Sequence, residues 1–154
     1  MARALVLSVL AACALVTNPA AAGAQEDQVT TFSYTRIYAD STGRSHFSDE
    51  RMELGLVTPG RGVPPTPASA PIPARGMRLF CPPAGGAADW HPVPGRVFNL
   101  LISGELEIEV SSGETRRFGA GSLILGEDTT GRGHRTRVVG EEKACFVMVR
   151  LPDE

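Results

Sequence analysis

The sequence is poor in cysteine and histidine and has no excess of basic residues. It contains 3 Cys and 3 His among 154 residues, and no Cys-x-x-Cys pair occurs, which excludes a zinc knuckle and a dithiol redox motif. The 15 Lys and Arg residues are outnumbered by 17 Asp and Glu residues, which argues against nucleic acid and anionic membranes as partners. No Gly-x-Ser-x-Gly segment occurs, which argues against a hydrolase of the Ser-His-Asp type.

Long apolar segments and helical periodicity are also missing from residue 25 onward. The one apolar run, Ala4–Val16, contains a single serine and is too short to span a bilayer. It follows a basic start and precedes the A-x-A sequence Ala22–Ala24, which is the layout of a secretory signal peptide. We therefore expect cleavage after Ala24 and a secreted or periplasmic chain without a transmembrane segment. Because Leu10–Cys13 also has the pattern of a lipobox, a lipid anchor on Cys13 is the alternative.

What remains is a series of short strands separated by turn residues. Thr31–Tyr38 alternates and is rich in Thr and aromatic residues, so it predicts a strand, with Ser45–Leu54 as its hairpin partner. Six prolines in Thr58–Ala74 predict an extended connector, because proline lacks the amide proton of regular structure. The further predicted strands are Met77–Cys81, Arg96–Ile102, Glu105–Val110, Thr115–Phe118, Ser122–Gly126, His134–Val139 and Ala144–Leu151. Short strands with glycine turns predict an all-β sandwich or barrel.

The same features divide the chain into four parts. We expect a signal peptide over residues 1–24, an N-terminal hairpin extension over 25–57, a proline-rich connector over 58–75 and a barrel over 76–154. The barrel would contain the two remaining cysteines, Cys81 and Cys145. Outside the cytoplasm such a pair can form a disulfide, and two separate buried thiols are the alternative.

Three residues in the second half of the chain have the spacing of a known motif. Gly85, His91 and Gly104 fit the first glycine, the first histidine and the last glycine of G(X)5HXH(X)3,4E(X)6G. This is the first motif of the cupins, a family of small jelly-roll barrels that the chain resembles. The second histidine and the glutamate of the motif fall on Val93 and Val97.

A second set of residues extends the resemblance. Gly121, Gly131 and His134 fit parts of the second cupin motif, G(X)5PXG(X)2H(X)3N, with a loop that is two residues longer. The stretch Arg116–His134 and a hairpin around residues 36–47 are similar to a subgroup of small bacterial cupins of unassigned activity. The resemblance implies a cupin-type jelly-roll (double-stranded β-helix) barrel with an N-terminal β-hairpin extension.

The resemblance also implies a metal centre, and this sequence departs from it. Typical cupins hold Fe, Mn, Zn or Ni through three imidazoles and a carboxylate, a donor set that suits borderline divalent metals. Here His91 and His134 are the candidate metal ligands, and they are equally the candidate catalytic acid and base. Val93 and Val97 cannot coordinate, but His46 could supply a third ligand to a divalent metal (Fe, Mn or Zn), and Asp128 or Glu127 could supply the carboxylate. The alternative is a metal-free pocket, and the sequence leaves both open.

Strand parity selects further pocket residues. Val97 and Asn99 share one face of a predicted strand, and Thr136 shares a face with His134 on another. Trp90 offers a stacking surface for a planar ligand, with ordinary packing as its alternative. The candidate ligand pocket therefore comprises Trp90, Val97, Asn99, Asp128, Thr136 and His46.

Three kinds of function are consistent with such a chain. It could be an enzyme acting on a small organic molecule, either by isomerase-, cyclase- or lyase-type acid–base chemistry or with a metal. It could also be a non-catalytic module that binds a small ligand, because the two valines make the pocket wall apolar. The third reading is a structural role, with a homodimer as the expected assembly. The main expected partner is a small molecule, whose identity the sequence does not specify.

Overall fold

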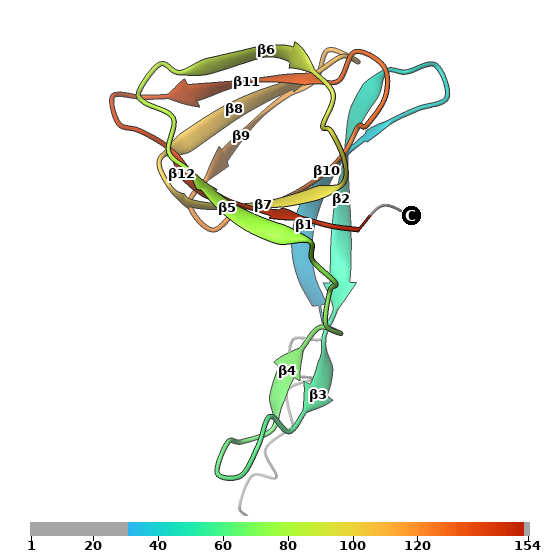
Figure 1. Ribbon diagram of the computed structural model, residues 1–154, viewed down its shortest axis with the longest axis vertical. Helices are drawn as coiled ribbons and strands as arrows, with labels where there is room; N and C mark the ends of the chain where they lie inside the picture. The colour runs from blue at the N-terminus through green and yellow to red at the C-terminus, as the bar shows by residue number, and fades with distance from the viewer. Residues whose placement is uncertain (1–30, 153–154) are drawn as a thin grey trace, which may run out of the picture.

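The computed structural model describes residues 31–152, so the expected signal peptide and Cys13 lie outside the described residues. All regular secondary structure in this range is β-strand, as the sequence predicts (Figure 1). Within the same range, no helix has the length and apolar character needed to cross a membrane. The strands are β1 (Thr31–Ala39), β2 (Ser45–Glu53), β3 (Gly55–Val57), β4 (Thr66–Ala68), β5 (Gly76–Phe80), β6 (Ala87–His91), β7 (Val97–Ser103), β8 (Glu105–Val110), β9 (Thr115–Gly119), β10 (Leu123–Glu127), β11 (His134–Val139) and β12 (Cys145–Arg150).

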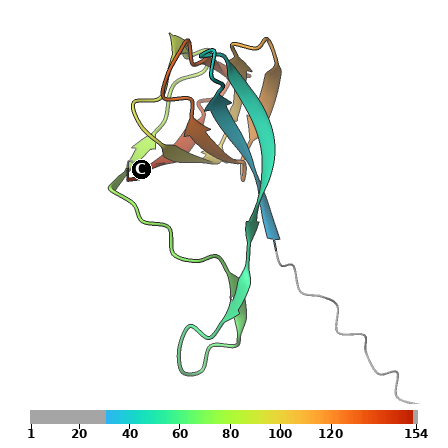
Figure 2. The same cartoon turned by 90° about the vertical axis from the view of Figure 1, so that its right-hand side faces the viewer.

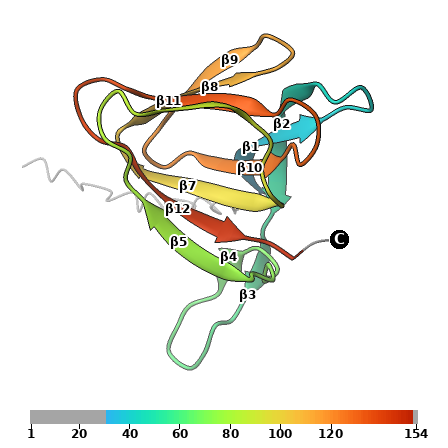
Figure 3. The same cartoon turned by 45° about the horizontal axis from the view of Figure 1, so that its top comes forward.

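Strands β5 to β12 form two facing sheets (Figure 3). The first sheet contains the order β10-β7-β12-β5, and the second has the order β6-β11-β8-β9. The chain passes back and forth between the sheets, and this eight-strand arrangement is the double-sheet jelly roll. The predicted jelly-roll fold is confirmed with one correction. The two sheets are hydrogen-bonded separately in the described residues and do not close into a continuous barrel.

The N-terminal hairpin widens the first sheet. Strands β1 and β2 are antiparallel from Thr31↔Glu53 to Ala39↔Ser45, and β1 pairs in parallel with β10. The turn between them is stabilised by Asp40, whose carboxylate accepts hydrogen bonds from the backbone N–H groups of Thr42 and Arg44 at 2.8 and 3.1 Å. A short acidic side chain that bonds its own backbone in this way specifies a tight turn. The hairpin is therefore part of the main sheet.

The core lies between the two sheets and follows from strand alternation. In β8, the apolar side chains of Leu106, Ile108 and Val110 are buried, while the glutamates between them face solvent. Alternation of this kind directs one face of a strand to the core and the other to water. The same cluster receives residues of the hairpin and of the other sheet, namely Ile37, Phe47, Leu101, Phe118, Ile124, Val138 and Ala144.

Residues 54–75 form an arm that projects from the two sheets (Figure 2). Within it, β3 pairs with β4 in a two-stranded sheet of its own, with Gly55 opposite Ala68. The expected proline-rich connector therefore contains one short strand, Thr66–Ala68. The ends of the other predicted strands agree with the observed ones to within one residue.

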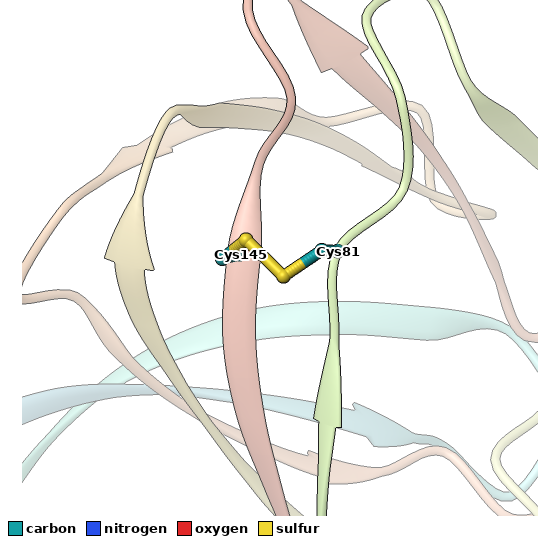
Figure 4. Close-up of a disulfide and its surroundings, with 2 residues drawn as sticks. All are labelled: Cys81 and Cys145. Atoms are coloured by element: carbon teal, nitrogen blue, oxygen red, sulfur yellow. A yellow bond between two sulfur atoms is a disulfide. The ribbon is translucent and has the colours of Figure 1, made fainter.

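The structure joins Cys81 and Cys145 by a disulfide (Figure 4). Cys81 directly follows β5 and Cys145 begins β12, so the bridge fastens the outermost strand of the first sheet to its neighbour. Their Cα atoms are 4.1 Å apart, and 64 positions separate them in the sequence. The bridge therefore encloses most of the jelly roll.

Candidate functional site

A cavity of about 340 Å³ lies between the two sheets. Its volume is at the lower end of the range of small-molecule sites, which is about 300–1,000 Å³. The wall formed by the first sheet includes Val97, Asn99, Ile124, Phe146 and Met148, and the wall formed by the second includes Ala88, His91, Leu106, Ile108, His134, Thr136 and Val138. Most of these side chains are apolar. The cavity suits a small molecule with a largely apolar surface.

His134 is held at the cavity wall by a buried carboxylate. Its Nδ1 lies 2.7 Å from Oδ2 of Asp128, a residue with 0% exposure. Because an ionised carboxylate only accepts hydrogen bonds, Nδ1 is the donor and carries the proton. This leaves Nε2 as the ring nitrogen of His134 that is available to a molecule in the cavity. The sequence predicted that Asp128 lines the cavity. In the structure it does not line the cavity and instead supports His134 from behind.

His91 is oriented in the same sense by a backbone group. Its Nδ1 lies 2.7 Å from the carbonyl oxygen of Asp89, which can only accept, so Nδ1 is again the donor. His91 and His134 are opposite each other in the β6–β11 pairing, and their ring centroids are 4.8 Å apart. Both Nε2 atoms are thus free for a ligand. Two adjacent imidazoles can accept and donate protons near neutral pH.

The residues at the other two cupin ligand positions close the wall with methyl groups. Val93 and Val97 are buried, with 7% and 4% exposure. Both pack over Gly126 of β10, where an added Cβ would lie 3.1 and 3.2 Å from their Cγ1 atoms. Within residues 31–152, no three His, Cys, Asp or Glu side chains gather where they could hold a metal ion. The residues at this site therefore do not fit the cupin metal centre.

His46 does not reach the cavity. Its Nε2 lies 2.8 Å from Oδ2 of Asp40, and its ring stacks on Tyr38 at a centroid distance of 5.6 Å. This pairing holds it at the hairpin turn, and it is not among the residues that line the cavity. The structure thus places His46 away from His91 and His134, where it cannot serve as their third ligand.

Trp90 also lies outside the cavity. The guanidinium carbons of Arg132 and Arg135 lie 4.0 and 5.3 Å from the centre of its ring, so it is covered by cations on the outer side of the second sheet. Neighbouring side chains of a strand point to opposite faces, so Trp90 points outward where His91 points into the cavity.

The remaining predicted pocket residues line the cavity, Val97 and Asn99 from the first sheet and Thr136 from the second. The side-chain oxygen of Asn99 is buried and has no hydrogen-bond partner among the described residues. Phe146 and Met148 of β12 were missed, although the alternation of that strand would have indicated them.

The loop between β10 and β11 positions His134 at the cavity wall, and the conformation of this loop depends on two glycines. Gly133 has φ +72°, and an added Cβ would lie 2.0 Å from the carbonyl oxygen of His91. Gly131 has φ +74° and approaches the backbone of Gly43 in the hairpin turn just as closely. Positive φ and such close approach both require glycine. The hairpin turn, the loop and His91 are therefore packed backbone to backbone.

Glu127 ties the hairpin to the same loop. Its carboxylate accepts hydrogen bonds from Arg36 of β1 and, at 2.6 Å, from Nε of Arg96. Burial raises the pKa of Glu127, but the hydrogen bonds from the two arginines outweigh it and hold the pKa below the usual carboxylate value. The ionised form is therefore the form that the fold stabilises.

We expect Glu127→Gln to lower the free energy of unfolding by about 1–3 kcal/mol at neutral pH, because it removes charge-assisted hydrogen bonds to two arginines. A carboxyl group whose pKa is lower in the folded state than in the unfolded state stabilises the fold at pH values above its unfolded-state pKa. This stabilisation is lost as the pH falls through the folded-state pKa. The difference in unfolding free energy between variant and wild type should thus have its full size above about pH 5 and become smaller below it. Urea unfolding at several pH values measures it. Glu114→Gln, at an exposed pair with Arg116, is the control and should change stability little; equal losses in both variants would contradict the role of Glu127.

No protein-family model matches the sequence, and no curated protein is found to be similar to it. Several solved structures are similar at low identity. A conserved protein of unknown function from Streptococcus pyogenes is 22% identical, with 56% of this chain and 72% of that chain covered and a TM-score of 0.38. The cupin domain of Cnp3 from Schizosaccharomyces pombe is 10% identical, with 80% and 85% covered and a TM-score of 0.41. The Cupin_2 domain of an XRE-family transcriptional regulator from Enterobacter cloacae is 17% identical, with 80% and 98% covered and a TM-score of 0.30.

The fold itself rests on the strand order. Strands β5 to β12 are distributed over two sheets in the jelly-roll order, and His91 and His134 meet at the wall of the cavity between those sheets. The chain therefore has a double-sheet jelly-roll fold.

Proposed function

We propose that the protein binds a small, largely apolar organic molecule in its cavity and transfers a proton on it. The observation that carries this proposal is the buried Asp128–His134 pair, whose free Nε2 belongs to a residue that lines the cavity. A carboxylate behind an imidazole fixes the tautomer and stabilises the imidazolium that forms when Nε2 accepts a proton. His134 is the catalytic base in this proposal, and Asp128 is its positioning residue.

A carbonyl compound is the substrate class that suits two imidazoles side by side. His134 Nε2 takes a proton from the carbon next to the carbonyl, and the electron pair of the broken C–H bond forms a C=C bond. The π pair of the carbonyl moves to its oxygen, which receives the proton carried by Nε2 of a protonated His91. When His134 returns a proton to carbon, the O–H proton goes back to Nε2 of His91 and the carbonyl re-forms. A proton returned to the same carbon completes an exchange, and one returned to another carbon completes an isomerisation. The apolar walls favour this step at the base, because His134 is only 8% exposed and has little contact with water.

We propose export from the cytoplasm together with this function. The bridge between Cys81 and Cys145 favours an oxidising compartment, because disulfides persist there and are rare in the cytosol. The signal-like N-terminal segment argues in the same direction. Secretion or transfer to the periplasm therefore belongs to this proposal, with the lipid anchor on Cys13 as its alternative.

Non-catalytic binding of a small ligand is the second candidate. It is favoured by Val93 and Val97, which turn the polar metal cradle of typical cupins into an apolar wall. In this case the two histidines would hydrogen-bond the ligand without moving a proton. The donor set supports no step through a metal, so both candidates use only the residues of this chain.

Hydrogen–deuterium exchange of cyclohexanone in D₂O distinguishes the two candidates. Cyclohexanone has an apolar ring and acidic C–H bonds next to its carbonyl, and proton NMR follows the loss of those protons. We expect the protein to accelerate the exchange above the buffer rate and His134→Ala to abolish the acceleration. His46→Ala is the matched control and should keep it, because His46 lies outside the cavity.

The outcomes separate the alternatives. Cyclohexanone could bind, seen as shifts of the NMR signals of the cavity methyl groups, without accelerated exchange. This result would favour non-catalytic ligand binding over the proposed enzyme. Acceleration that survives His134→Ala would place the chemistry elsewhere. Metal content of protein purified without a histidine tag is measured alongside, and stoichiometric Fe, Mn or Zn that is lost in His134→Ala would contradict the metal-free site.

A further inference from the structure

Arg150 brings a positive charge to the cavity. It is the last residue of β12, and alternation along the strand places it on the same face as Phe146 and Met148, which also line the cavity. Among the described residues that line the cavity, Arg150 alone has a fixed charge, and none is acidic. A cation at the wall of a largely apolar cavity favours a ligand that is mostly apolar and carries one negative group.

The guanidinium of Arg150 keeps hydrogen-bond donors for a ligand. A guanidinium has five N–H donors, and Nη2 of Arg150 donates to the carbonyl oxygen of Pro94 at 3.0 Å. No carboxylate among residues 31–152 forms an ion pair with Arg150, whereas other arginines of the chain do pair with carboxylates. They are Arg36, Arg96, Arg116, Arg117, Arg135 and Arg137. The charge of Arg150 is thus not neutralised within the described part of the chain.

A second arginine shares the inner face of the first sheet. Arg78 of β5 is opposite Met148 of β12 and is two positions before Phe80, which lines the cavity. Residues two apart on a strand point to the same face, so Arg78 points to the same side as Phe80. Arg78 and Arg150 are diagonal neighbours in the β5–β12 pairing, and such neighbours are about 7–8 Å apart. Their charges add to one positive potential at this edge of the cavity.

Arg150 lies at the end of the cavity that contains the two histidines. It is opposite Val97 in the β12–β7 pairing, and Val97 packs over Gly126 together with Val93, which is two residues after His91. Figure 1 shows β6 and β12 ending, and β11 beginning, at the same end of the two sheets. Facing sheets are about 10 Å apart. One small molecule can therefore contact Arg150 on one wall and the histidines on the other.

We propose that the ligand of the cavity is a small organic carboxylate, whose carboxylate group binds the guanidinium of Arg150. This inference rests on the proposed function and narrows its substrate class to carbonyl compounds with a carboxylate at the opposite end. The planar guanidinium presents parallel N–H groups that match the two oxygens of a carboxylate. The carboxylate then lies against the first sheet and directs the carbonyl end of the molecule toward His91 and His134 on the second.

Calorimetric titration with cyclohexanecarboxylate tests this site without any proton transfer, because the probe has no ketone. Cyclohexanecarboxamide has the same shape without the charge and is the matched probe. We expect wild-type protein to bind the carboxylate at least about tenfold more tightly than the amide, and Arg150→Gln to lose this preference. Arg117→Gln removes a charge from the edge strand β9 of the other sheet, so it is the control variant and should keep the preference.

Three results would overturn the carboxylate site. The first is equal binding of the two probes by wild-type protein, a comparison that remains decisive if circular dichroism shows that Arg150→Gln does not fold. The second is a preference that survives in folded Arg150→Gln. The third is displacement of cyclohexanecarboxylate by an equal concentration of inorganic phosphate, which would assign the site to a different anion.

The substrate class is tested with 4-oxocyclohexanecarboxylate, which is cyclohexanone with a carboxylate opposite the ketone. We expect kcat/KM for its deuterium exchange to exceed that of cyclohexanone by at least about tenfold in wild-type protein and Arg150→Gln to lose this advantage. If Arg150 determines the binding preference but neither ketone exchanges, the proposed function fails and the carboxylate site stands. If cyclohexanone exchanges but the carboxylate improves neither binding nor rate, the carboxylate site fails and the proposed function stands.

Discussion

Asp128→Asn should lower the rate of cyclohexanone exchange by about 10²- to 10⁴-fold, the size of a general-base contribution. The carboxylate of Asp128 is fully buried and contacts Nδ1 of His134 at 2.7 Å. An asparagine keeps the size of the side chain but carries no charge, so it does not stabilise the imidazolium. Its amide can also present N–H to Nδ1 and favour the other tautomer, with the proton on Nε2. The measurement is the proton NMR exchange rate as a function of pH.

A structural role for Asp128 predicts a different result. If the residue only closes the loop, Asp128→Asn would lower stability and leave exchange by the folded protein unchanged. Asp40→Asn is the matched control, because Asp40 makes the same kind of contact with His46 at the hairpin turn. Among the three histidines it should change the signals of His46 alone, together with those of the hairpin turn, and leave exchange unaffected. An exchange rate equally reduced in both variants would remove the positioning role.

Replacement of both bridge cysteines should cost about 4 kcal/mol of unfolding free energy. Cys81 and Cys145 are 64 positions apart, and closing a loop of that length restricts the unfolded chain by about this amount in the chain-entropy description. The expected result for Cys81→Ala/Cys145→Ala is a large drop in the urea midpoint. Because the bridge also fastens the edge strand β5 to β12, amide protection in β5 should fall further than in the rest of the sheet.

A reductant provides the control for the bridge. Wild-type protein with a reductant should lose the same stability as the double variant, and the variant itself should not respond. If wild-type protein and variant unfold at the same urea concentration without reductant, the two cysteines are separate thiols. That result would also weaken the case for export.

The sequence predicts most of the jelly roll because its strands alternate and end at glycine turns. It does not predict β6, because Ala87–Ala88 has little β propensity and follows a proline–glycine segment. It also does not predict the pairing of β3 with β4. Three paired residues on each side, one of them a proline, give no recognisable pattern.

The site was predictable where it depends on parity and unpredictable where it depends on long-range pairing. Val97 and Asn99 follow from alternation along one strand. Trp90 was a pocket candidate because it is adjacent to His91, but neighbours on a strand face opposite sides, and Trp90 lies outside the cavity. His46 was a candidate ligand because the sequence does not show that Asp40, across the hairpin turn, holds it. The support of His134 by Asp128 depends on the loop geometry around two positive-φ glycines, which only the fold reveals.

The imidazole ¹⁵N spectrum reports the tautomers of His91 and His134 separately, because the chain has only 3 histidines. In long-range ¹H–¹⁵N spectra at about pH 8, above the usual imidazole range, His91 and His134 should both carry the proton on Nδ1 and have an unprotonated Nε2. On titration with cyclohexanone, both Nε2 signals should shift, and those of His46 should remain in place. Nε2–H tautomers at His91 and His134, or shifts confined to His46, would contradict the account.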